Sequence, residues 1–226
     1  MKLSVIIPFF NEAQHIIEVL DAVCAVDIPK EIIVVDDGST DQSAAIVAEY
    51  CKKQPIVLHK SIQNFGKGTA IRIGLQYVTG DIVIIQDADL EYDPQQYPKM
   101  IAPILEGKAD VVYGSRFRGS ITGMKLANRI ANRILAWTAN LLYRAGITDE
   151  ATCYKAFRTD LIKSVPLNCT RFEFCPEVTA KLRKRGITIY EVPITYVGRS
   201  TAEGKKIRWT DAFSAMWTLI KYRFKD

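Results

Sequence analysis

The first half of the chain alternates short apolar runs with longer stretches in which apolar residues recur at helical spacing. The apolar runs are rich in Val and Ile, which is typical of strands buried on both faces of a parallel sheet. Strands that alternate with helices predict βαβ units, and therefore a Rossmann-like, doubly wound α/β sheet that is mostly parallel. The predicted strands cover residues 3–7, 32–35, 56–58, 82–85 and 111–113, and the predicted helices cover 12–25, 41–53, 69–78 and 94–106.

The pattern changes after about residue 116. Residues 126–143 carry an apolar stripe at helical spacing, which predicts an amphipathic helix. Residues 187–197 alternate as a strand does but contain Pro193, which predicts an edge strand or a bulge. We predict a single domain over 1–226, with a helical and β-hairpin elaboration after the sheet. It ends in an amphipathic helix over 209–224 whose apolar face holds Trp209, Phe213, Met216, Trp217, Ile220 and Phe224.

Composition and cysteine content are those of an ordinary globular protein. Of the 226 residues, 48% are hydrophobic and 24% are charged, which excludes disordered and disulfide-stapled classes. The five cysteines form no C-x-x-C pair, which argues against a zinc site and favours a reducing compartment. The apolar N-terminus has no small-residue cleavage site and is interpreted as a strand. The longest uncharged stretches of the second half are about half of the ~20 residues that a membrane span requires.

The net charge of +5 is concentrated at the C-terminal end. Residues 199–226 contain seven Lys or Arg and three Asp or Glu, whereas the remaining residues are nearly neutral. A basic tail indicates an anionic partner, which at this point is a phosphate, a membrane surface or a nucleic acid. The alternative is a tail that is simply solvated.

Carboxylates follow two of the predicted strands. Asp36 and Asp37 end the second strand, and helix capping by residues 39–41 does not explain them. A carboxylate at such a strand end can accept hydrogen bonds from a ribose hydroxyl or a base N–H. No G-x-G-x-x-G follows the first strand, which makes a Rossmann dehydrogenase improbable.

A second acidic group, Asp87-Ala88-Asp89-Leu90-Glu91, follows the fourth predicted strand. In an extended chain, Asp87, Asp89 and Glu91 project to one side, where three carboxylates repel unless a cation lies among them. Oxygen ligands suit Mg²⁺ or Mn²⁺, the ions that bridge diphosphate oxygens. A solvated acidic turn is the alternative. Lys67, between two glycines at a predicted helix start, is a weaker candidate for phosphate binding, since the Walker A spacing is absent.

These motifs, in this order, resemble the GT-A glycosyltransferases of family 2, and the resemblance covers nearly the whole chain. It is most specific for the dolichyl-phosphate mannose synthase branch, which implies a GT-A fold and inverting transfer of a hexose from a nucleotide sugar to a polyprenyl phosphate, with a divalent cation. The motifs that carry it are GSRF (114–117), NRIANR (128–133), TDEATCYKAFR (148–158) and Arg199 followed by Lys205-Lys206.

The resemblance also implies a role for individual residues. Residues 1–115 would form the nucleotide-sugar half, and 116–226 the acceptor half. Glu91 departs from the usual Gln of the metal site, Asn128 from an arginine, and 204–206 from Gly-Glu-Ser-Lys. The nucleotide sugar would be bound by Pro8, Glu12, Asp36, Asp37, Lys67, Asp87, Arg199 and Lys205. The metal would be held by Asp87, Asp89 and Glu91, and catalysis would rest on Asp89 and on the acceptor-phosphate arginines Arg116, Arg129 and Arg133.

The expected reaction needs no general base, because a lipid phosphate has its second pKa near ~6 and is already ionised at neutral pH. Arginines would bind it, since the guanidinium fork matches phosphate oxygens. The donor is GDP-mannose or UDP-glucose, and no nucleic acid is expected. We expect a cytoplasmic protein, peripheral at the membrane face, bound to the membrane surface or to an integral-membrane partner. The alternatives are transfer to a sugar hydroxyl of a glycan, a non-catalytic nucleotide-sugar binder, and a nucleotidyltransferase.

Overall fold

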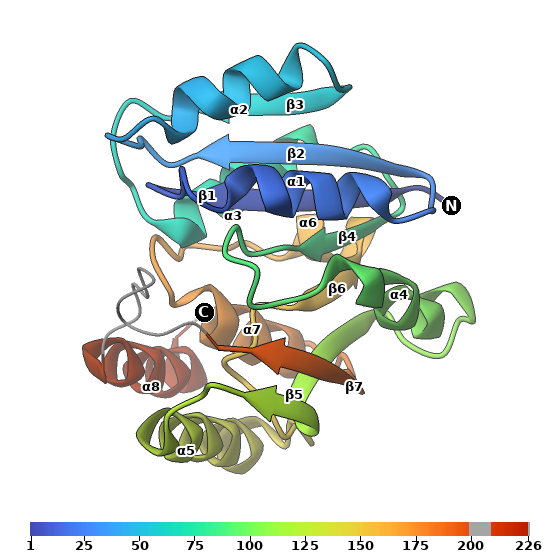
Figure 1. The fold of residues 1–226 in the computed structure, drawn as a ribbon. Helices are drawn as coiled ribbons and strands as arrows, with labels where there is room; N and C mark the ends of the chain where they lie inside the picture. The colour runs from blue at the N-terminus through green and yellow to red at the C-terminus, as the bar shows by residue number, and fades with distance from the viewer. Residues whose placement is uncertain (199–208, 226) are drawn as a thin grey trace.

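The computed structural model describes residues 1–198 and 209–225, in which helices cover a seven-stranded sheet (Figure 1). The sheet order is β3-β2-β1-β4-β6-β5-β7. The strands are β1 (Leu3–Phe9), β2 (Lys30–Asp36), β3 (Ile56–Lys60), β4 (Ile82–Ile85), β5 (Val111–Thr122), β6 (Lys155–Arg158) and β7 (Tyr190–Val197). The helices are α1 (Ile16–Ala25), α2 (Ser43–Cys51), α3 (Lys67–Tyr77), the short 3-10 helix η1 (Pro94–Gln96), α4 (Tyr97–Leu105), α5 (Leu126–Tyr143), α6 (Thr159–Ser164), α7 (Phe174–Lys184) and α8 (Trp209–Phe224).

The sheet is the predicted doubly wound, mostly parallel one. Parallel pairing joins β1 to β2 and β4, β2 to β3, and β5 to β7. Among the described strands, only β6 runs antiparallel, between β4 and β5. β7, with Pro193, lies at the sheet edge as predicted. The predicted hairpin is wrong, because β7 pairs with β5 in parallel, a pairing that requires a long crossover rather than a tight turn.

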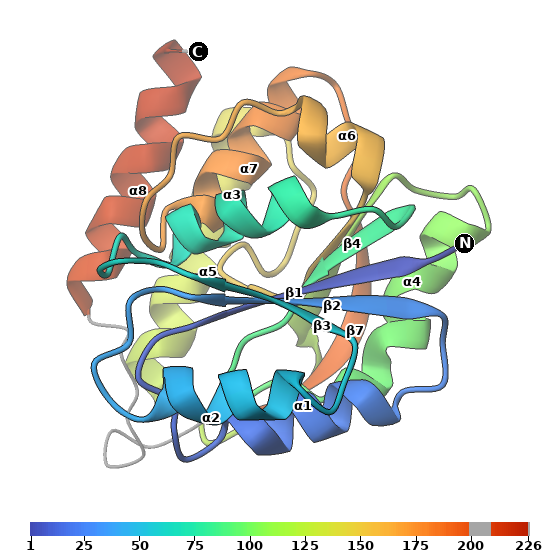
Figure 2. The same cartoon turned by 90° about the horizontal axis from the view of Figure 1, so that it is seen from above.

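Helices cover both faces of the sheet (Figure 2). α1, α2 and α4 lie on one face, and α3, α6 and α7 lie on the other. Alternate residues of β1 belong to different apolar cores: Ile6 shares one core with Ile71 of α3, and Val5 shares the other with Val19 of α1. Because each central strand contributes to both cores, its sequence is a continuous apolar run.

The second half adds three helices that pack against one another, α5, α7 and α8. α5 and α8 begin and end at the predicted residues. α5 buries Leu135 and Ala139 in the core, and α8 buries Leu219 and Tyr222. The Tyr143 hydroxyl donates to the carbonyl of Leu219 and ties the two helices together. None of the described helices is long and apolar enough to cross a bilayer.

Candidate functional site

Two adjoining cavities lie beyond the carboxyl ends of the central strands, where a doubly wound sheet binds ligands. The first cavity has a volume of about 380 Å³ and the second about 200 Å³. They share three lining residues, Asp87, Glu91 and Phe172. Ligands in the two cavities would therefore meet at the carboxylates that follow β4.

The first cavity gathers most of the residues predicted to bind a nucleotide sugar. Pro8, Glu12, Asp37 and Lys67 all line it, together with the predicted metal ligands Asp87, Asp89 and Glu91. Asp36 is buried beside the cavity, where its carboxylate accepts a hydrogen bond from the backbone N–H of Ser39 at 2.9 Å. Arg199 and Lys205 lie outside the described residues.

Asp37 holds the loop that precedes α3. Its carboxylate accepts hydrogen bonds from the backbone N–H groups of Phe65 at 2.9 Å and Gly66 at 2.8 Å. Burial raises the pKa of Asp37, and these two bonds offset part of that effect. Gly66 has a φ of +96°, and a Cβ at this position would lie 2.4 Å from the carbonyl oxygen of Thr170. Only glycine fits here, so the loop that lines the first cavity is held in one conformation.

Lys67, the first residue of α3, reaches across to Asp87 and forms an ion pair with it. Burial disfavours the ammonium, but the Asp87 carboxylate outweighs that penalty and holds the pKa of Lys67 well above its usual range. Its Nζ also lies 3.0 Å from the Cys153 sulfur. Lys67 therefore brings a permanent positive charge to the junction of the two cavities.

The chain after β4 is a turn and is not extended, so the predicted alternation of Asp87, Asp89 and Glu91 is wrong. Leu90 has a φ of +58°, in the left-handed region that non-glycine residues seldom adopt. The turn lets the backbone N–H of Glu91 donate to the Asp89 carboxylate at 3.2 Å. The Glu91 carboxylate faces Tyr196, whose hydroxyl donates to it at 2.7 Å. The turn nevertheless leaves all three carboxylates lining one cavity.

Carboxylate oxygens of this kind suit a divalent cation in donor type. Among the described residues, however, no three Asp, Glu, His or Cys side chains are grouped to hold one. Asp87 is engaged with Lys67, and Glu91 with Tyr196. A cation at this edge would therefore need diphosphate oxygens of the substrate and water to complete its ligands.

The second cavity is built around Arg116, which follows the regular part of β5 where its register with β7 shifts. The guanidinium forms a bidentate pair with Asp149, with both N–O distances at 2.7 Å, and its centre lies 5.2 Å from the Tyr196 ring. Arg116 is only 6% exposed, and Asp149 is fully buried. The motif containing Asp149 was noticed in the sequence, but its pairing with Arg116 was not predicted. α5, α7 and α8 also contribute to the wall, with Asn128, Asn132, Cys175, Pro176, Asp211 and Ala215.

Comparison with known families identifies this architecture. The model of glycosyl transferase family 2 matches residues 4–165, which include the first cavity's strand ends, Arg116 and Asp149. The chain belongs to glycosyltransferase family 2. It is 31% identical over 211 residues to an undecaprenyl-phosphate 4-deoxy-4-formamido-L-arabinose transferase from Klebsiella pneumoniae, covering 90% of this chain and 62% of that protein. It is 29% identical over 214 residues to a dolichol-phosphate mannosyltransferase from Pyrococcus furiosus, covering 91% and 59%. The chain thus spans about three fifths of these relatives.

Solved structures confirm the GT-A fold. Glucosyl-3-phosphoglycerate synthase from Mycobacterium tuberculosis, solved with Mn²⁺, UDP and phosphoglyceric acid, superposes with a TM-score of 0.76 at 21% identity, covering 99% of this chain and 78% of that one. Mannosyl-3-phosphoglycerate synthase from Rubrobacter xylanophilus gives a TM-score of 0.77 at 20% identity, covering 98% and 72%.

The second cavity of this family 2 transferase also contains a carboxyl group that sequence reasoning missed, Glu150. Burial raises the pKa of Glu150, and the nearby Lys155 offsets only part of that effect. One carboxyl oxygen accepts from the Thr179 hydroxyl at 3.1 Å, and the other is buried with no hydrogen-bond partner in the described part of the chain. A carboxyl group of raised pKa can donate or accept a proton at a bound acceptor.

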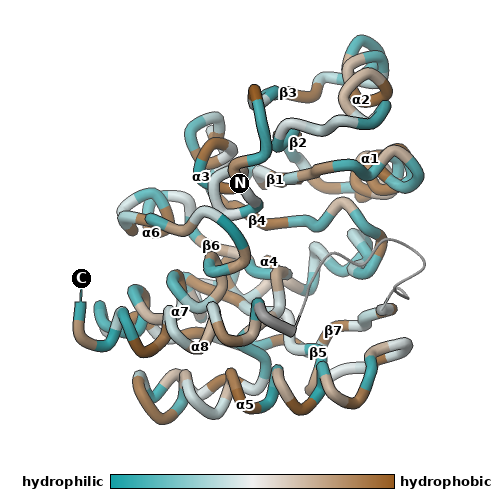
Figure 3. Tube along the Cα trace, turned by 90° about the vertical axis from the view of Figure 1, so that its left-hand side faces the viewer, coloured by the Kyte–Doolittle hydropathy of each residue, from teal (hydrophilic) through white to brown (hydrophobic). Residues whose placement is uncertain are grey.

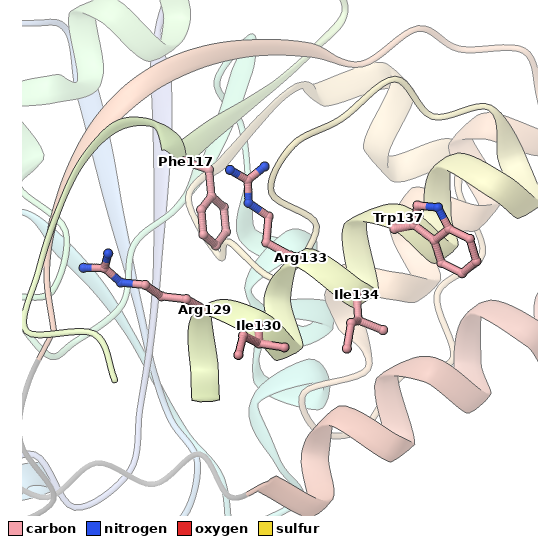
Figure 4. Close-up of a pocket in the computed structure, with 6 residues that line it drawn as sticks. All are labelled: Phe117, Arg129, Ile130, Arg133, Ile134 and Trp137. Carbon is pink, nitrogen blue, oxygen red and sulfur yellow. The ribbon is translucent and has the colours of Figure 1, made fainter. Parts of the chain in front are cut away.

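Arg129 and Arg133, predicted to accompany Arg116, line neither of these cavities. They lie in a third cavity of about 440 Å³, on the outer side of α5, with Phe117 and Trp137 (Figure 4). The helical period explains the separation, because residues 128 and 132 turn toward the second cavity while 129 and 133 are rotated by ~100°. The structure therefore does not bring the three predicted arginines together.

Two further residues of the transferase come from the segment before α7. Arg171 and Phe172 line the first cavity, and Phe172 lines the second as well. Their only signal in the sequence is an arginine next to an aromatic residue ahead of a helix. They belong to the predicted acceptor half, so the first cavity draws on both halves of the chain.

Proposed function

We propose that the chain transfers a hexose, with inversion, from a nucleotide sugar in the first cavity to a polyprenyl phosphate in the second. The observation that carries this proposal is the meeting of the two cavities at Asp87 and Glu91, with the buried cation of Arg116 on the far side. Both similar proteins named above act on a polyprenyl phosphate, undecaprenyl or dolichol. The proposed donor is GDP-mannose or UDP-glucose.

The residues of the first cavity would bind the donor in a defined orientation. Asp36 and Asp37 would accept hydrogen bonds from the nucleoside. Pro8 and Glu12 would lie beside its base. Lys67 would face the diphosphate from the start of α3. Mg²⁺ or Mn²⁺ held by Asp89 would supply neutralisation of the leaving diphosphate. With Asp87 paired to Lys67, these groups leave the sugar directed toward the second cavity.

The second cavity would orient the acceptor phosphate for in-line attack on the sugar. Arg116 is fixed by Asp149, so its charge is pre-organised and needs no rearrangement when the phosphate arrives. The phosphate oxygen attacks C1, the bond from C1 to the diphosphate breaks, and the configuration inverts. An ionised phosphate needs no proton removed, so positioning and electrostatics account for the rate.

A second candidate function rests on Glu150. A general base in the second cavity is what transfer to a sugar hydroxyl requires, and Glu150 has an unpartnered oxygen and a raised pKa there. In the leading proposal its protonated form donates a hydrogen bond to the acceptor phosphate. Glu150 therefore acts as a general base in one function and as a hydrogen-bond donor in the other. A Glu150→Gln variant distinguishes between the two functions.

The proposed place of action is the cytoplasmic membrane face, where a polyprenyl phosphate is met. All five cysteines are free thiols. The predicted apolar face of the last helix is largely outward: Phe213, Trp217, Ile220 and Phe224 are exposed, whereas Met216 packs against the core. The side chain of Trp209 lies outside the described residues.

The test is transfer of label from radioactive GDP-mannose or UDP-glucose to a polyprenyl phosphate, with Mg²⁺ or Mn²⁺ and with EDTA. We expect one donor to give an organic-soluble labelled lipid, and EDTA to abolish it. Release of free labelled sugar only, or full activity in EDTA, would refute the proposed reaction or the cation requirement.

A further inference from the structure

Two cysteines meet at the wall of the second cavity, and the proposed reaction uses neither of them. Cys153 lies just before β6, Cys175 is the second residue of α7, and both line the cavity. β6 and α7 lie side by side, with the rings of Phe157 and Phe174 edge to face and 6.5 Å between their centroids (Figure 3). The two sulfur atoms are 4.0 Å apart. The fold therefore holds these two thiols in contact.

The ammonium of Lys67 activates Cys153. Its Nζ donates to the Cys153 sulfur at 3.0 Å, and Cys153 is partly exposed where it lines the cavity. The contact with Cys175 and the charge of Lys67 lower the pKa of the Cys153 thiol. Together they outweigh the opposing effects of burial and of the Asp87 charge. Because the thiolate is the reactive form of cysteine, Cys153 is a nucleophile that small molecules can reach from the cavity.

Cys175 has the opposite character and is placed to react second. It is only 5% exposed, and its thiol donates to the carbonyl of Thr152 at 3.3 Å. The contact with Cys153, together with burial, holds the pKa of Cys175 well above its usual range. Cys175 therefore stays protonated while its neighbour is ionised. An accessible thiolate of low pKa with a second cysteine beside it is the arrangement found at redox-sensing sites.

We propose that Cys153 is a site of reversible oxidation by hydroperoxides, and that Cys175 resolves the product as a disulfide. The Cys153 thiolate attacks the terminal peroxide oxygen, so that an S–O bond forms and the O–O bond breaks. The departing oxygen takes a proton from solvent and leaves as water or an alcohol. The Cys175 sulfur then attacks the sulfenic acid of Cys153, and the S–O bond breaks as hydroxide leaves with the Cys175 proton as water. The two thiols lose two electrons in all, and the peroxide gains them.

The disulfide would alter the second cavity. Its formation shortens the distance between the sulfurs from 4.0 Å to ~2 Å and draws the segment before β6 toward α7. That segment carries Glu150 of the same cavity and Asp149, which holds Arg116. Oxidation also removes the thiolate that Lys67 contacts at the junction of the two cavities. We expect the oxidised protein to transfer sugar more slowly, and this consequence alone rests on the proposed function.

The test is treatment of the full chain with hydrogen peroxide, without any sugar donor, followed by peptide mapping with mass spectrometry. We expect a disulfide between Cys153 and Cys175 in the parent, which dithiothreitol reverses. In the Cys175→Ser variant, the sulfenic acid of Cys153 should persist and be labelled by dimedone. Circular dichroism confirms that the variants are folded, and the map of the parent needs no variant.

Cys51, at the end of α2, is the matched control. It is also partly exposed, but burial raises its pKa, and α2 lies far from α7 (Figure 1). We expect dimedone to label Cys51 at least ~10-fold more slowly than Cys153, because the thiolate is the form that reacts. The Cys51→Ser variant should form the disulfide as the parent does.

Two results would overturn the oxidation site. They are equal rates of labelling at Cys51 and Cys153, and peroxide treatment that forms no disulfide between Cys153 and Cys175. The transfer assay then compares the oxidised with the reduced parent, where we expect a loss of at least ~10-fold that dithiothreitol restores, since small displacements in a site are costly. Equal transfer by both forms would refute the effect on the reaction. Disulfide formation in a protein that transfers no sugar when reduced would refute the proposed function alone.

Discussion

Arg116 and Asp149 show how a single buried pair serves both stability and the proposed acceptor site. Asp149 accepts three hydrogen bonds from Arg116, including one from its backbone N–H at 3.0 Å. Removing one partner leaves an uncompensated buried charge, which is costlier than removing both.

We therefore expect Arg116→Ala to lower the free energy of unfolding by about 3–5 kcal/mol. The double variant Arg116→Met/Asp149→Asn should regain most of that stability and still fail to transfer sugar. Urea denaturation and a transfer assay measure the two effects separately. A stable Arg116→Ala protein, or an active double variant, would contradict this role for the pair.

Asp89 is the residue predicted both to hold a divalent cation and to serve catalysis. We expect Asp89→Asn to reduce kcat by at least ~100-fold and to weaken cation-dependent binding of the donor, since stabilisation of the leaving diphosphate would be lost. Asp93→Asn is the matched control, because Asp93 is exposed and caps η1 through Gln95. Calorimetric titration of donor with and without Mg²⁺ checks the binding. Equal losses in both variants would remove Asp89 from the cation site.

Glu150 separates the two candidate acceptors. With a phosphate acceptor, Glu150→Gln keeps a hydrogen-bond donor and should leave kcat/KM within about tenfold, with a rate that rises through pH ~6 as the phosphate ionises. With a hydroxyl acceptor, loss of the general base should cost about 100-fold or more. The pH profile and kcat/KM of parent and variant decide between them.

Elements with apolar patterns were predicted well from the sequence, and elements with polar residues in buried positions were not. β6 was not predicted, because it begins at Lys155 and a lysine usually indicates an exposed position. Lys155 is fully buried, donating to the carbonyls of Glu150 at 2.8 Å and Thr152 at 2.6 Å, and lies over the Tyr113 ring. The loop carbonyl oxygens that accept hydrogen bonds from its ammonium come together only in the folded chain.

The candidate site was predicted as a set of residues but not as a geometry. The strand-end rule placed Asp37, Asp87 and Asp89 at one edge of the sheet without knowledge of the fold. The turn at Leu90 depends on a left-handed φ, which the local sequence did not predict. The arginines of α5 were treated as one cluster, although the period of the helix separates their sides.

Glu31, near the start of β2, gives a pH prediction for the fold. Burial disfavours the charge of Glu31, but hydrogen bonds from Lys2, Ser4 and Thr79 outweigh it and lower its pKa from 4.5 to about 2. A lowered pKa stabilises the fold fully above pH 4.5, and the contribution is lost as pH falls toward 2. We expect the free energy of unfolding to decline over this window, and Glu31→Gln to flatten the decline. Parallel pH profiles of the two proteins would contradict it.

At the scale of the whole molecule, the first cavity, proposed for the donor, and the second cavity, proposed for the acceptor, adjoin at the turn after β4. The helices that line the second cavity, α5 and α8, expose apolar side chains on their outer sides. The acceptor that we propose has an anionic head and an apolar tail, which suits this arrangement.

Acceptor choice tests that arrangement most directly. With the active donor and Mg²⁺ or Mn²⁺ present, labelled sugar is offered a polyprenyl phosphate, the corresponding polyprenol and an oligosaccharide, and each product is counted. We expect label only on the polyprenyl phosphate, because Arg116 requires an anion and an ionised phosphate needs no base. Label on the polyprenol or the oligosaccharide, with none on the lipid phosphate, would contradict the proposed reaction.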